Sequence, residues 1–92
     1  MKDKYKELQE NLIKIIEIID NFKLSKNDYI KPDIRSYQLQ ISHLGKIIGN
    51  KVKKAVDDLI IIIDEYLSCP NQEKYEKLIF LAKKLQENIW EL

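Results

Sequence analysis

Apolar residues recur at spacings of three and four along almost the whole chain. In the first segment the charged residues lie between the members of this apolar stripe, which are Tyr5, Leu8, Leu12, Ile15, Ile19 and Phe22. The spacing matches the 3.6-residue period of an α-helix and predicts an amphipathic helix over residues 3–22. Further isoleucines at positions 13, 16 and 18 widen the stripe, so this helix is expected to contact more than one neighbour.

The pattern stops over residues 24–31, where Ser25, Asn27 and Asp28 interrupt it. We expect a loop there, with Tyr29 and Ile30 holding it against the core. The next helix is predicted to begin near Pro32 and Asp33. Proline is tolerated in the first turn of a helix, and an aspartate there interacts favourably with the positive end of the helix dipole.

The middle of the chain allows two interpretations. Its stripe keeps spacings of three and four throughout, which fits one long helix over about residues 33–68; its members are Ile34, Tyr37, Ile41, Leu44, Ile48, Val52, Ala55 (or Val56), Leu59, Ile62 and Tyr66. Against this, Gly49 is a typical helix end and Asn50 can cap a new helix. A single helix would also be long for a small domain. We therefore predict a break at Gly49–Asn50. Alternatively, Gly45 and Gly49 together allow another helix to pack closely.

The clearest boundary is Cys69–Pro70–Asn71, because proline stops a helix and asparagine is a good N-cap. The last helix is predicted from Gln72 almost to the end of the chain, on a stripe of Tyr75, Leu78, Ala82, Leu85, Ile89 and Leu92. The predicted fold is all-α: one antiparallel helical-bundle domain over residues 1–92 with four helices. The alternative has three helices, the central one running from about 33 to 68.

Composition supports this fold class. The chain is 45% hydrophobic with only 2 Gly and 2 Pro, which argues against disorder and against a fold of many strands. The longest apolar run, Leu59 to Ile63, is far shorter than the roughly 20 residues of a transmembrane helix, and the charged N-terminus lacks a signal-peptide core. We therefore expect a cytoplasmic protein. A single arginine among 16 basic residues suggests an AT-rich genome, of a bacterium or phage.

The residues that usually carry chemistry are scarce. His43 is the only histidine and Cys69 the only cysteine, so the chain alone cannot supply a conventional zinc site. The Glu-x-x-His pairs of di-iron bundles are also absent from the sequence. We expect no enzymatic activity, no metal and no cofactor, and a small enzyme using His43 as a base is the least favoured alternative.

Lysines are densest at Lys46, Lys51, Lys53 and Lys54. Such a patch could attract nucleic acid, which gives an alternative function as a nucleic-acid-associated accessory protein. However, the net charge is only +1, and the patch lacks the aromatic residues that stack on bases. We therefore favour a solvated helix face and consider nucleic acid an unlikely partner.

The apolar residues exceed what four short helices need. Five consecutive apolar residues, from Leu59 to Ile63, span more than a helical turn, so some of them must point away from the core unless this helix is buried all round. The predicted partner surface comprises Ile60, Ile61, Ile63, Leu67 and Trp90. We expect a non-enzymatic protein–protein interaction module: a small regulator, inhibitor or immunity-type protein that binds another protein or a second copy of itself. Such proteins of low-GC bacteria and phages often have this size and build.

Overall fold

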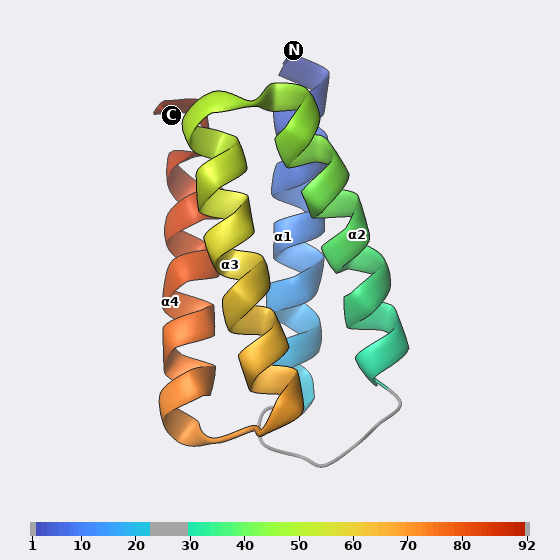
Figure 1. Ribbon diagram of the computed structural model, residues 1–92, viewed down its shortest axis with the longest axis vertical. Coiled ribbons are helices and arrows are strands. Elements are labelled where there is room, and N and C mark those ends of the chain that lie inside the picture. The colour runs from blue at the N-terminus through green and yellow to red at the C-terminus, as the bar shows by residue number, and fades with distance from the viewer. Residues whose placement is uncertain (1, 23–29, 92) are drawn as a thin grey trace.

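The computed structural model describes residues 2–22 and 30–91, and it confirms the all-α bundle of four helices (Figure 1). The helices are α1 (Lys2–Phe22), α2 (Ile30–Ile48), α3 (Asn50–Ser68) and α4 (Gln72–Asn88), and a 3₁₀ turn, η1 (Ile89–Glu91), follows α4. Each helix packs against the next one in the chain, and α1 also packs against α4, which closes the ring. The start of α1, the α2–α3 turn and the end of α4 lie at the same end of the bundle.

Most of the core comes from the predicted stripes, although Phe22 at the end of the first stripe is 36% exposed. Every helix contributes side chains that are at most 1% exposed, among them Leu8, Leu12, Ile15, Ile19, Ile34, Ile41, Val52, Val56, Leu59, Leu78 and Ala82. Tyr66 of α3 is the largest of the fully buried side chains. Burial of these apolar stripes provides the main driving force for folding.

The predicted break at Gly49–Asn50 is confirmed, and the alternative of one long central helix is wrong. Gly49 has φ of +77° and Asn50 has φ of +54°, so two successive residues in the left-handed region reverse the chain between α2 and α3. Asn50 does not act as the predicted cap. It is the first helical residue, Gly49 occupies the N-cap position, and among the described residues no side chain caps α3.

The two glycines have different roles. Gly45 is buried, and a Cβ placed on it would lie 3.2 Å from Cβ of Val56, so its small size lets α2 approach α3 closely. A Cβ on Gly49 would meet nothing within 4 Å, so Gly49 is needed for its backbone conformation. The close-packing interpretation therefore holds for Gly45 alone.

Two helix boundaries refine the predictions. Helix α2 begins at Ile30, two residues before Pro32, because Ile30 is buried and Pro32 still falls in the first turn, where no backbone donor is required. Tyr29 and Leu92 lie outside the described residues. Helix α4 begins as predicted: Asn71 caps it, with its Oδ1 accepting a hydrogen bond of 2.8 Å from the Lys74 backbone nitrogen.

Candidate protein-binding surface

The structure buries some residues of the predicted partner surface in the core and leaves others exposed. Ile63 and Leu67 are 0% and 3% exposed and belong to the core, which corrects their assignment to the surface. They are buried because α3 packs against both α2 and α4, so its buried arc is wider than one stripe. Ile60 is half-buried against the core, and Ile61 is 56% exposed.

Trp90 lies in η1 and is 52% exposed. Its ring stacks on Tyr5 of α1, with 5.3 Å between the ring centroids. The stacking attaches the last described turn to the beginning of α1, whereas Ile61 lies midway along α3. The five residues singled out from the sequence therefore do not form one continuous surface.

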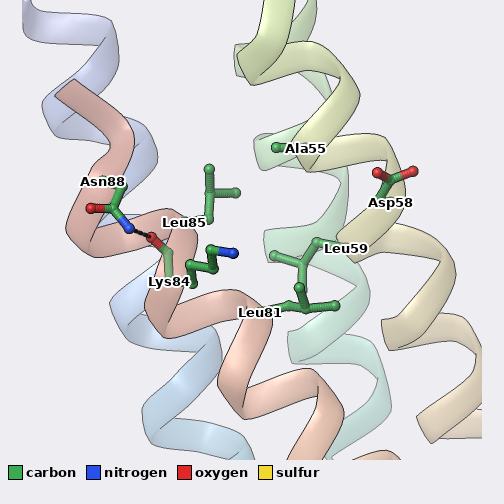
Figure 2. Close-up of a pocket in the computed structure, with 7 residues that line it drawn as sticks. All are labelled: Ala55, Asp58, Leu59, Leu81, Lys84, Leu85 and Asn88. Carbon is green, nitrogen blue, oxygen red and sulfur yellow. Dashed lines mark hydrogen bonds between the residues drawn. The ribbon is translucent and has the colours of Figure 1, made fainter. Parts of the chain in front are cut away.

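A groove of about 230 Å³ runs between α3 and α4 (Figure 2). Leu59 and Leu81 lie side by side between the two helices, and Lys84 extends from α4 toward α3. The groove is thus mainly apolar with charged groups at its edges; its lining residues are Ala55, Asp58, Leu59, Leu81, Lys84, Leu85 and Asn88.

Two large apolar side chains lie beside this groove. Ile61 follows Asp58 by three residues and Phe80 precedes Lys84 by four, so each lies one helical turn from a residue that lines the groove. Phe80 is 65% exposed, and Nζ of Lys84 lies 5.9 Å from the centroid of its ring. Sequence reasoning missed Phe80, although its position two residues from both Leu78 and Ala82 places it on the opposite side of the helix.

The four lysines of the predicted basic patch gather around the α2–α3 turn. Lys46 lies in the last turn of α2, and Lys51, Lys53 and Lys54 lie at the beginning of α3, all of them exposed. Nζ of Lys53 is 2.9 Å from Asp57, one turn further along α3. The structure therefore brings these lysines to one end of the bundle, and a role for them in binding nucleic acid stays a prediction.

A buried amide connects α2 to α3. Gln38 is 7% exposed, and its Nε2 donates to Asp64 at 2.8 Å and to the Ile60 carbonyl oxygen at 3.2 Å. Arg35 donates to Oε1 of Gln38 at 2.8 Å and also pairs with Asp64. The Gln38 hydrogen bond, together with Arg35, lowers the pKa of Asp64 against a smaller opposing effect of burial. These contacts fix the register of the two helices.

A second polar contact joins α1 to α4. The hydroxyl of Tyr75 donates a hydrogen bond to Oδ1 of Asp20. That hydrogen bond is the main reason why the pKa of Tyr75 is raised to about 12, with burial and the Asp20 charge adding to it. Both polar contacts hold helices together, and neither contributes to the groove.

The groups considered for chemistry lie apart. His43 is exposed on α2, and the free Cys69 is exposed where α3 ends. Within residues 2–22 and 30–91, no three of the His, Cys, Asp and Glu side chains are grouped so that they could hold a metal ion. None of the helices in these ranges is long and apolar enough to cross a membrane.

Comparison of the chain with models of protein families, with curated proteins and with solved structures finds no match.

Proposed function

We propose that this protein is a non-enzymatic protein–protein interaction module that binds through the outer side of α3 and α4. We call this surface the α3–α4 face and define it by the groove together with Ile61 and Phe80. The observation that carries the proposal is the exposure of these two large apolar side chains beside an apolar groove. An exposed apolar patch with a polar rim is typical of a surface that another protein covers.

The chemistry of the face suits contact better than catalysis. Its centre offers leucine side chains that can bury apolar groups of a partner, while Asp58 and Lys84 at its edges can orient that partner. A chain with this face can act by occupying the surface of another protein, as small regulators, inhibitors and immunity-type proteins do. This role requires neither His43 nor Cys69.

Leu39 provides the matched control for a test. It is 73% exposed, more than Phe80, but it lies on α2 between two glutamines. A glutamate introduced at any of the three positions replaces an exposed apolar side chain, so all three variants should fold. Circular dichroism and thermal unfolding check this expectation.

The test is affinity capture from cells that express the chain with a tag. We expect the wild type and Leu39→Glu to retain the same proteins, and Ile61→Glu and Phe80→Glu to lose them. A set of captured proteins that is identical for all four chains would contradict the proposal. A salt-sensitive gel shift with DNA or RNA, abolished by Lys51/Lys53/Lys54→Glu, would instead support the nucleic-acid-associated alternative.

A further inference from the structure

Two rows of residues, one on each helix, run through the α3–α4 face and extend beyond it at both ends. The row on α3 has spacings of four, three and four, and the row on α4 has spacings of three, four and three, so each row follows one side of its helix. The rows are Lys54, Asp58, Ile61 and Glu65 on α3, and Lys77, Phe80, Lys84 and Glu87 on α4. Since Asp58 and Lys84 both line the groove, the two rows border it from opposite sides.

The rows are complementary when compared level by level. Helices α3 and α4 run in opposite directions (Figure 1), and Leu59 and Leu81 lie side by side in the groove (Figure 2), so they mark one common level. Counting residues outward from that level along both helices matches each residue of one row with a residue of the other row, and the levels of the two agree to within two residues. Each match joins either two opposite charges or two apolar side chains. The pairs are Lys54 with Glu87, Asp58 with Lys84, Ile61 with Phe80, and Glu65 with Lys77.

These charges are available for a partner. All six charged side chains of the rows are exposed. The ion pairs among the described residues join Lys4 to Glu7, Lys14 to Glu17, Arg35 to Asp64 and Lys53 to Asp57, so none of the six belongs to one. The matched rows therefore border the groove without being paired across it.

We propose that the α3–α4 face binds a second copy of this chain in a symmetric dimer, whose two-fold axis runs along the groove parallel to the helices. This proposal rests on the proposed function and names the partner. Rotation about that axis leaves every level unchanged and places α3 of each chain against α4 of the other. Ile61 then meets Phe80 of the partner subunit, and Asp58 meets Lys84 of the partner subunit. Every pair occurs twice, as an isologous interface requires.

The whole side of the bundle that carries this face is large enough for a dimer interface. The bundle is 37 Å long and between 18 and 22 Å wide. One side therefore covers about 700 Å², close to the roughly 800 Å² that each partner buries in an interface of standard size. In the dimer the apolar pairs lie at the centre and the ion pairs toward the ends, which is the usual distribution of apolar and polar residues in an interface.

The first experiment measures mass by sedimentation velocity over a range of concentrations. We expect the wild type and the control Leu39→Glu to form dimers, and Ile61→Glu and Phe80→Glu to remain monomers with an unchanged circular dichroism spectrum. A wild type that stays monomeric, or a dimer that persists in both face variants, would overturn the proposal.

The second experiment tests the orientation by charge exchange. Asp58→Lys and Lys84→Glu each bring like charges together twice per dimer, so each is expected to weaken self-association on the order of tenfold. In an equimolar mixture the two variants should form a heterodimer, because the two substituted side chains then face each other with opposite charges. The second pair of that heterodimer consists of the unchanged Lys84 of one chain and the unchanged Asp58 of the other. If Asp58 and Lys84 pair within one chain, mixing the two variants does not restore association, and the proposal fails.

The capture experiment separates this proposal from the proposed function. A chain that is monomeric but retains another protein through Ile61 and Phe80 supports the module and overturns the dimer. A chain that neither dimerises nor retains a protein in a way that depends on this face contradicts both proposals.

Discussion

Tyr75 is the residue whose protonation is most clearly linked to the fold. Its pKa is raised to about 12 chiefly by its hydrogen bond to Asp20, so the folded state favours the neutral phenol. The stability gained from this contact is fully present below pH 10, the usual pKa, and is lost as the pH rises from about 10 to about 12. We expect Tyr75→Phe to lower the free energy of unfolding by about 1 kcal/mol at pH 7. The difference from the wild type should disappear over that alkaline range.

Urea unfolding of both chains at several pH values measures this difference. The other titratable groups are common to both chains, so their contributions cancel in the comparison. If the free energy of unfolding of Tyr75→Phe stays lower than that of the wild type by a constant amount up to about pH 12, the hydroxyl contributes in another way. Asp20→Asn keeps an acceptor but removes the charge, so it should bring the pKa of Tyr75 closer to its usual value.

The small size of Gly45 allows α2 to pack closely against α3. In Gly45→Ala the new Cβ would lie 3.2 to 3.4 Å from three side-chain atoms of the fully buried Val56. We expect this crowding to exceed the gain in helix propensity and to lower the free energy of unfolding by about 1 kcal/mol. In a Val56→Ala background the two Cγ contacts disappear while the Cβ contact at 3.2 Å remains, so the same substitution should cost less there than in the wild type. Thermal unfolding of the four chains measures the coupling, and equal effects in both backgrounds would contradict it.

At the scale of the helices, the Gln38 network fixes α2 against α3. The pKa of Asp64 lies below 3.8, so its contribution to stability is present above about pH 4 and is lost as the pH falls through the lowered value. Since the side chain of Asp64 is half exposed, we expect Asp64→Ala to cost only about 1 kcal/mol at pH 7. The cost should decrease steadily below about pH 4. Denaturant titrations at pH 7 and pH 3 test this. A cost of Asp64→Ala that is larger at pH 3 than at pH 7 would contradict the claim that the ionised Asp64 side chain stabilises the fold.

The helices themselves could be predicted from the sequence, because burial on one side imposes spacings of three and four. The turn at Gly49 could be predicted only as one of two alternatives. The apolar spacing from Ile34 to Tyr66 is the same whether the chain forms one straight helix or two helices joined by a tight turn. The spacing therefore cannot show where the chain reverses its direction. Only the left-handed conformations at Gly49 and Asn50 distinguish the two, and residue types merely permit these conformations.

The candidate surface was less predictable than the fold. Which residues of the run from Leu59 to Ile63 face outward depends on how many helices cover α3, and periodicity does not give that number. Contacts with both α2 and α4 bury Ile63 and Leu67 and leave Ile61 exposed. Phe80 was not predicted, because the inward stripe of α4 gives no information about which residues on the opposite side of the helix take part in a surface. The hydrogen bonds that Gln38 donates go to residues of α3, so they had no local signal in the sequence of α2.

At the scale of the whole molecule, the α3–α4 face combines apolar pairs with charged ones, and salt separates their contributions. The ion pairs of the proposed dimer are exposed, so raising the ionic strength from about 0.02 M to about 0.5 M should screen them, while contact between Ile61 and Phe80 should persist. We expect the dissociation constant of the wild type to rise a few-fold. The loss of dimer affinity caused by Asp58→Lys should shrink over the same range, because salt also screens the repulsion between the new lysine and Lys84 of the partner subunit. Sedimentation at both salt concentrations measures the two effects, and a loss independent of salt would mean that Asp58 and Lys84 do not face each other across the interface.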